Sequence, residues 1–125
     1  MLTDLEAAAV AGLLDSPHPV AAALRRQAGR IAAVRREFTG AGFFTDFTLP
    51  PDEPPAPSAP PVGPAGRLVV GGLDADLGPA GEPCAFLLLV EAGRLRGLEG
   101  AACGDAWPAE APARFARSAG WPFAG

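Results

Sequence analysis

Carboxylates beside the expected strand ends are the residues best suited to acid–base or cation chemistry. They are Asp46, Asp74, Asp76, Glu99 and Asp105. Two converging carboxylates can bind a cation or transfer a proton. Asp74 and Asp76 share a strand face or a turn, so these two side chains can converge. The DADLG pattern lacks the further ligands and the closing glutamate of an EF-hand loop. We therefore interpret this pair as solvated carboxylates at a turn.

Glu99 differs from the other acids because it follows an apolar strand. We expect it to form a structural ion pair with Arg36 or Arg96. If that pair is partly buried, removing one member leaves an uncompensated charge, which is costly. The alternative is that Glu99 contacts a ligand or a partner.

Other residue types that carry chemistry are sparse. His18, the single histidine, stands between two prolines with no nucleophile at a motif spacing, so we expect an exposed residue at a helix start. Cys84 abuts an apolar run and is expected in the core, whereas Cys103 is expected to be more exposed. The segment Gly40–Gly42 lacks the third glycine and the following helix of a dinucleotide fingerprint. We predict no catalytic, cofactor-binding or metal-binding residues and no cofactor.

Two helices are the first elements expected to position these residues. Thr3 and Glu6 form a capping-box pattern that predicts a helix over residues 4–14. Ser16 is expected to cap a second helix with a proline in its first position. Gly29 is a typical stop for that helix.

A β-hairpin is expected next, because the apolar period changes to two from Ile31. Residues 39–42 supply the turn and residues 43–49 the second strand. Phe43 and Phe44 are adjacent, so their side chains must point to opposite faces of the sheet. Aromatic residues at strand spacing are typical of a core; the alternative is a ligand pocket or a partner surface.

Residues 50–66 hold eight prolines in 17 residues and are expected to form an exposed, extended arm. Three further strands are expected over residues 67–73, 85–90 and 94–99. The run AFLLLV at residues 85–90 is apolar on both faces, which is typical of a central strand covered on both sides. The second face must then be covered by the aromatic tail, by curvature of the sheet or by a second copy. Residues 109–119 are interpreted as a short helix.

The chain also carries three short motifs: TGAGFFT at Thr39–Thr45, LEG at Leu98–Gly100 and WP at Trp107–Pro108. In these motifs it resembles a group of small, uncharacterised bacterial proteins with a TGxGFFT, LEG and WP pattern. The resemblance spans residues 20–108, but residues 101–104 depart from the aromatic and polar segment usual in that group. No activity is known for the group, so the resemblance bears on the fold and not on a reaction.

Bulk composition excludes some classes of function. Hydrophobic residues make up 49% of the 125 residues, so a folded domain is expected. The net charge of −4 argues against a nucleic-acid partner, which requires a basic face. The longest apolar run, Cys84–Val90, is too short to cross a membrane, which takes roughly 20 residues. Acids at the N-terminus do not fit a secretion signal, so we expect a cytoplasmic protein with reduced cysteines.

We therefore predict a single α+β domain over residues 1–125, with two N-terminal helices packed on a curved, mainly antiparallel sheet of about five strands. The favoured function is that of a small, non-catalytic cytoplasmic protein-interaction module, and an immunity or antitoxin protein is one case. We expect it to associate either with itself, as a homodimer, or with a protein partner. The alternative is a small-molecule binding domain or an enzyme that uses carboxylates around an aromatic pocket. The candidate partner or ligand contacts are Phe43, Phe44, Asp46, Glu99, Asp105 and Trp107.

Overall fold

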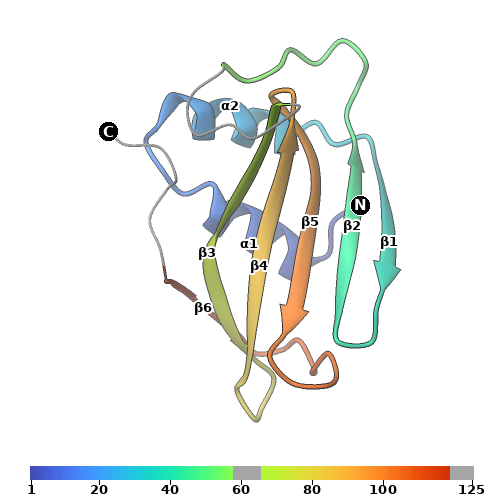
Figure 1. Ribbon diagram of the computed structural model, residues 1–125, viewed down its shortest axis with the longest axis vertical. Helices are drawn as coiled ribbons and strands as arrows, with labels where there is room; N and C mark the ends of the chain where they lie inside the picture. The colour runs from blue at the N-terminus through green and yellow to red at the C-terminus, as the bar shows by residue number, and fades with distance from the viewer. Residues whose placement is uncertain (58–65, 119–125) are drawn as a thin grey trace.

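A computed structural model describes residues 1–57 and 66–118 of the chain. Two helices precede six strands, and all neighbouring strands pair antiparallel in the order β1-β2-β5-β4-β3-β6 (Figure 1). This confirms the predicted α+β class, with one strand more than expected. The elements are α1 (Asp4–Leu13), α2 (Pro19–Ala28), β1 (Ala33–Phe38), β2 (Gly42–Thr48), β3 (Arg67–Leu77), β4 (Glu82–Glu91), β5 (Arg94–Ala102) and β6 (Ala113–Arg117).

Local capping explains where the two helices begin. The Thr3 hydroxyl accepts a hydrogen bond from the Glu6 N–H, and the Glu6 side chain accepts one from the Thr3 N–H, which confirms the predicted capping box. The prediction for α2 was wrong by two residues, because the N-cap is His18 and not Ser16. The His18 Nδ1 accepts from the Val20 N–H, while the Ser16 hydroxyl accepts from the His18 N–H.

Both helices lie on one face of the sheet (Figure 1). Helix α1 packs against β3, β4 and β6, and α2 packs against β5. Between the two layers lies a single core in which the largest fully buried side chains include Phe86, Leu13, Leu14, Leu24, Leu77, Leu88 and Leu98. On β4 the alternation is clear, because Phe86 and Leu88 are buried while Leu87 and Leu89 are only half-buried. Only one face of this central strand is therefore covered by the helices.

Two irregularities interrupt the long central strands. The register between β3 and β4 shifts between Val70 and Leu73, where Gly72 takes a φ of 82° that glycine adopts without strain. A second shift between β4 and β5 lies beside Arg96. Bulges of this kind increase the local twist of a sheet. The sheet is visibly bent around the helices and ends in two edge strands, β1 and β6 (Figure 1).

The proline-rich arm departs from the prediction in its first half. Glu53 and Ala56 are only 6% and 7% exposed. The guanidinium of Arg94 donates to the carbonyl oxygens of Pro50 and Glu53, and the amide of Gln27 donates to that of Pro54. Proline removes N–H groups but leaves every carbonyl as an acceptor, so a proline-rich segment can still be held by side-chain donors. The arm was expected to continue through residues 58–65, which lie outside the described residues.

The predicted helix over residues 109–119 is wrong within the described part of the chain. Residues 113–117 form β6, which pairs with β3 along Leu73–Leu77. Pro112 disfavours a helix through this segment. The ring of Phe115 packs 5.7 Å from that of Phe86, so the segment is held as an edge strand by a core contact that local sequence does not reveal. Residue 119 lies outside the described residues.

Candidate interaction surface

The sheet separates the sequence-predicted contact residues into two groups. Phe43 is buried on the face that carries the helices, and Trp107 packs beside it. Phe44 and Glu99 lie directly opposite each other on β2 and β5, on the helix-free face, and Asp46 follows two residues along the same face. Asp105 is exposed in the loop after β5. The six residues therefore do not form one site.

Phe43 and Trp107 belong to an aromatic cluster of the core. The two rings meet edge to face at 5.2 Å and 86°, and Trp107 also lies 6.2 Å from the ring of Phe86. Gly100 stands opposite Phe43 in the register, and a Cβ atom there would lie 2.4 Å from the Phe43 ring. The glycine therefore provides the space in which the ring lies. These contacts assign Phe43 and Trp107 to packing.

A small cavity adjoins this cluster. It has a volume of about 160 Å³ and is bordered by Phe38, Phe43, Glu6, Arg36 and Glu110, with Thr3 and Leu5 completing its wall. The Trp107 indole N–H donates to the Glu110 carboxylate at 2.9 Å. None of the three sequence-predicted carboxylates Asp46, Glu99 and Asp105 lines this cavity.

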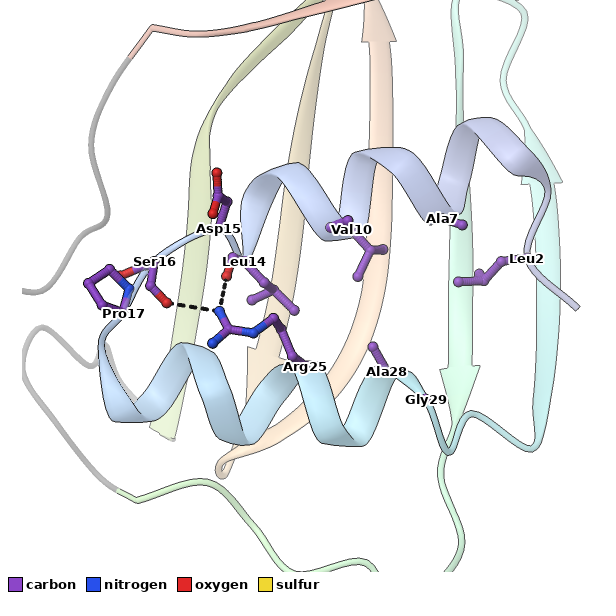
Figure 2. Close-up of a pocket in the computed structure, with 11 residues that line it drawn as sticks. Leu2, Ala7, Val10, Leu14, Asp15, Ser16, Pro17, Arg25, Ala28 and Gly29 are labelled. Atoms are coloured by element: carbon purple, nitrogen blue, oxygen red, sulfur yellow. Dashed lines mark hydrogen bonds between the residues drawn. The ribbon is translucent and has the colours of Figure 1, made fainter.

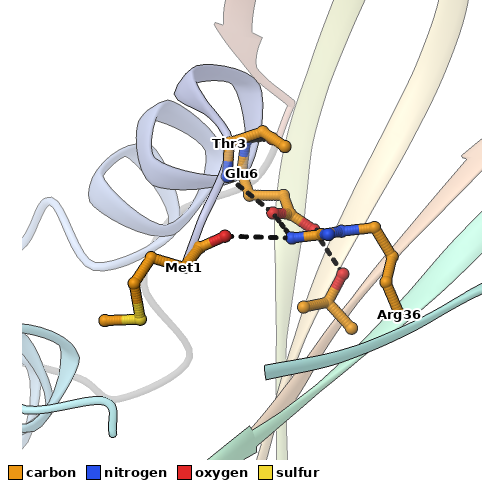
Figure 3. Close-up of polar contacts among 5 residues, drawn as sticks. Met1, Thr3, Glu6 and Arg36 are labelled. Carbon is orange, nitrogen blue, oxygen red and sulfur yellow. Dashed lines mark hydrogen bonds and ion pairs between the residues drawn. The ribbon is translucent and has the colours of Figure 1, made fainter. Parts of the chain in front are cut away.

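Glu6 forms the densest polar network of the described residues (Figure 3). Arg36 donates to both carboxylate oxygens, at 2.7 Å from Nε and 2.5 Å from Nη2. The Thr45 hydroxyl and the Thr3 N–H donate to the same carboxylate. Burial by itself raises the pKa of Glu6, but the hydrogen bonds from Arg36, Thr45 and Thr3 outweigh it and hold the pKa below its ordinary value. The network fastens the start of α1 to β1 and β2.

The expected ion pair of Glu99 is wrong. Arg36 pairs with Glu6 on the helix-covered face, whereas Glu99 lies on the opposite face beside Phe44. Within residues 1–57 and 66–118, neither Arg96 nor any other basic residue forms a salt bridge with Glu99. Sequence reasoning assigned Arg36 to the wrong acid because Glu6, 30 residues away, meets it only after α1 packs on the sheet.

The helix-free face carries an apolar strip at its centre. Phe44 and Val69 are 40% and 52% exposed. Leu87 and Leu89 lie half-buried on β4 next to the strand of Val69, and Glu99 of β5 stands between Leu87 and Phe44. Val69 stands opposite Leu89 in the β3–β4 register, and Leu87 stands opposite Glu99 in the β4–β5 register. Sequence reasoning named Phe44 as a contact residue, included Leu87 and Leu89 only as part of the apolar run 85–90, and missed Val69. The signal was the two-sided apolar run of β4.

Charged side chains surround this apolar strip. The strand registers place four arginines and six carboxylates on the face. The face therefore has two more carboxylates than arginines and accounts for half of the formal net charge of −4 of the chain. The charged residues are Arg35, Arg67, Arg94 and Arg114, together with Glu37, Asp46, Asp74, Asp76, Glu91 and Glu99.

A second concave region is the groove between the two helices, with a volume of about 720 Å³ (Figure 2). Alkyl side chains such as Leu2 and Val10 line most of it. Arg25 reaches across from α2 and donates to the carbonyl oxygens of Leu14 and Ser16, at 2.5 and 2.8 Å. Arg25 therefore ties the C-terminal end of α1 to α2, and its guanidinium is engaged with the backbone.

Several residue types that could carry chemistry do not assemble. Among the described residues, no three His, Cys, Asp or Glu side chains gather closely enough to bind a metal ion. Cys84 is buried and Cys103 exposed, and both are free thiols. Over the same residues, neither helix has the length and apolar character needed to cross a bilayer. Asp74 and Asp76 share the helix-free face of β3, on a strand and not in the turn that we expected.

Comparison of the chain with protein-family models, with curated proteins and with solved structures gives no match.

Proposed function

We propose that this chain is a non-catalytic protein-interaction module that binds a basic protein partner through the helix-free face of its sheet. The single observation that supports the proposal is the exposed apolar strip of Phe44, Leu87, Leu89 and Val69 on that face. In an antiparallel sheet with one solvated face, that face is ordinarily polar. Exposed apolar side chains grouped on one face among charged residues are typical of a site for another macromolecule.

Charge supports a basic partner over a second copy of the chain. A face with six carboxylates and four arginines meets its own copy with negative charges in excess. A partner with an excess of arginine or lysine meets complementary charge and associates faster. An immunity or antitoxin protein, which would bind a basic toxin in the cytoplasm, is one case of this proposal.

The test uses substitutions on the strip that leave the core untouched. Val69→Asn and Leu89→Asn place a polar amide in the strip, and Ala8→Gln alters the exposed outer side of α1 as the matched control. Each purified protein is used to capture partners from an extract of the source cells, and the captured partner is then purified and titrated back. We expect both strip variants to lose at least tenfold in affinity for the purified partner, while the control binds as the parent does.

Hydrogen exchange identifies the surface directly. The proposal expects the partner to protect amides of β2, β4 and β5, while α1 and α2 exchange as in the free protein. Protection confined to the helices, or strip variants that bind with parental affinity, would contradict it. Sedimentation that shows a dimer of the parent and a monomer of the Leu89→Asn variant would identify the occupant as a second copy and overturn the basic partner.

A further inference from the structure

We infer that the helix-free face recognises an arginine or lysine side chain of its partner, seated over the ring of Phe44 between Glu37 and Glu99. The inference rests on the proposed function and specifies the chemistry of the partner at one row of the sheet. It concerns three side chains from β1, β2 and β5, which are far apart in the sequence and adjacent in the sheet.

The row is defined by the strand registers. Glu37 of β1 stands opposite Phe44 of β2, Phe44 stands opposite Glu99 of β5, and Glu99 stands opposite Leu87 of β4. Directly opposite residues of an antiparallel pair have Cβ atoms about 4.5–5.5 Å apart. The Phe44 ring is therefore flanked by one carboxylate on each side, and an alkyl side chain follows beyond the second.

In this row neither carboxylate stands opposite a basic residue, which on this face is otherwise true only of Asp74, opposite Ala85 and Ala116. Each arginine of the face stands opposite an acid in another row: Arg35 opposite Asp46, Arg114 opposite Asp76, and both Arg67 and Arg94 opposite Glu91. The Arg67 Nε lies 4.0 Å from the Glu91 Oε2. The residue opposite both Glu37 and Glu99 is instead Phe44. Within the described residues, neither glutamate forms a salt bridge.

An aromatic ring between two carboxylates selects a cation with an alkyl stem. The face of a phenylalanine ring attracts a guanidinium or ammonium group, and exposed pairs of this kind contribute modestly. Each carboxylate can accept a charge-assisted hydrogen bond from the same cation, and Leu87 can pack against the stem. An anionic side chain at this position would meet two like charges and be rejected.

The experiment titrates the folded protein with short peptides and follows its backbone amides by NMR. The probe is a five-residue peptide that alternates valine and arginine, and its counterparts carry glutamine or glutamate in place of arginine. We expect saturable shifts at the amides of Glu37, Phe44, Leu87 and Glu99 with the arginine peptide, weaker shifts with the glutamine peptide and none with the glutamate peptide. The arginine-dependent affinity should fall as salt rises from 50 to 500 mM, because the charges are exposed.

Three variants separate the contributions of charge and ring. Glu37→Gln with Glu99→Gln removes two carboxylates from the row and should weaken the arginine peptide about tenfold, since each exposed contact contributes modestly. Phe44→Leu keeps an apolar side chain without the ring and should weaken binding about threefold. Asp52→Asn with Glu82→Gln is the matched control, because it changes the net charge equally at two exposed positions away from the row. That control should bind as the parent does.

The outcomes distinguish this inference from the proposed function. Equal binding of the arginine and glutamine peptides, shifts confined to other residues, no saturable shift, or equal weakening in the matched control would each overturn the inference. If the Glu37 and Glu99 variant also binds the purified partner with parental affinity while Val69→Asn does not, the inference fails and the interaction surface stands. Parental affinity in both would refute the surface as well.

Discussion

Glu6→Gln tests the polar network that joins α1 to the sheet. Each carboxylate oxygen accepts two hydrogen bonds, from Arg36 and Thr3 at Oε1 and from Arg36 and Thr45 at Oε2. A glutamine amide would turn one of these acceptors into a donor that faces an N–H of Arg36, and it would leave Arg36 without its counter-charge. Breaking a buried ion pair in this way costs about 3–5 kcal/mol.

The expected cost for this network is smaller, because the Arg36 side chain is 25% exposed and water can solvate part of it. We therefore expect a loss of about 2–3 kcal/mol in the free energy of unfolding. For a domain of this size each kcal/mol lowers the Tm by roughly 4 °C, so the Tm should fall by about 10 °C. Glu99→Gln is the matched control, since Glu99 forms no salt bridge among the described residues, and its Tm should change by less than about 2 °C.

The pH dependence gives a second readout with a definite sign. The pKa of Glu6 is lower in the folded protein than its ordinary value of 4.5. The stabilisation by the ionised carboxylate is therefore complete above pH 4.5 and is lost as the pH falls through the lowered pKa of the folded state. The difference in stability between the parent and Glu6→Gln should shrink as the pH is lowered below 4.5.

Thermal unfolding followed by circular dichroism from pH 3 to pH 8 measures both effects. A Glu6→Gln protein with the parental Tm at pH 7 would refute the reasoning that the network holds α1 on the sheet. A difference in stability that stays constant across the acidic range would refute the assignment of the lowered pKa to Glu6.

Three further predictions follow from contacts outside this network. Gln27→Leu should lower the free energy of unfolding, measured in urea, by about 2 kcal/mol. The buried N–H of Leu95 donates to the Gln27 Oε1 at 2.8 Å, and the substitution leaves it without this acceptor. Parental stability would show that this N–H finds another acceptor. Arg25→Met keeps the alkyl stem but removes the two hydrogen bonds to the carbonyl oxygens of Leu14 and Ser16. It should lower the free energy of unfolding by about 1 kcal/mol in the same assay. An unchanged free energy of unfolding would mean that these bonds make no net contribution to stability. A thiol reagent at pH 8 should modify Cys103 quickly and Cys84 only after unfolding. The reason is that burial, with smaller contributions from the nearby acidic groups, raises the pKa of the Cys84 thiol to about 11. Fast modification of both thiols in the folded protein would contradict the buried placement of Cys84.

Local chemistry in the sequence accounts for much of the fold. The capping box at Thr3 and Glu6 predicts α1 because both hydrogen bonds form within one turn. The period of two around residues 39–42 predicts the β1–β2 hairpin for the same local reason. The adjacency of Phe43 and Phe44 required one ring on each face, and their exposures of 3% and 40% confirm that requirement. The two-sided apolar run of β4 also indicated that part of the apolar surface needs cover that the two helices do not provide.

Other features depend on residues distant in the sequence, and local pattern misassigned them. Residues 113–117 form a strand because they pair with the free edge of β3 and because the ring of Phe115 packs against that of Phe86. Neither contact can be read from residues 109–119 alone. The carbonyls of the arm are held by Gln27 and Arg94, whose donors arrive from α2 and β5. Sequence reasoning treated that segment as exposed because it considered only the missing N–H groups of proline.

The residues that make up the candidate surface were likewise brought together by contacts between distant parts of the sequence. The sequence by itself identified Phe44 and Glu99 as candidate contact residues and showed that acidic residues outnumber basic residues. Only the tertiary structure decided that α1 and α2 cover the face of Phe43 and leave the face of Phe44 to other contacts. It also decided that Glu6 binds Arg36, which left Glu99 beside an aromatic ring. The physical reason is that strand pairing and helix docking choose neighbours across tens of residues, whereas local periodicity specifies only which side chains share a face.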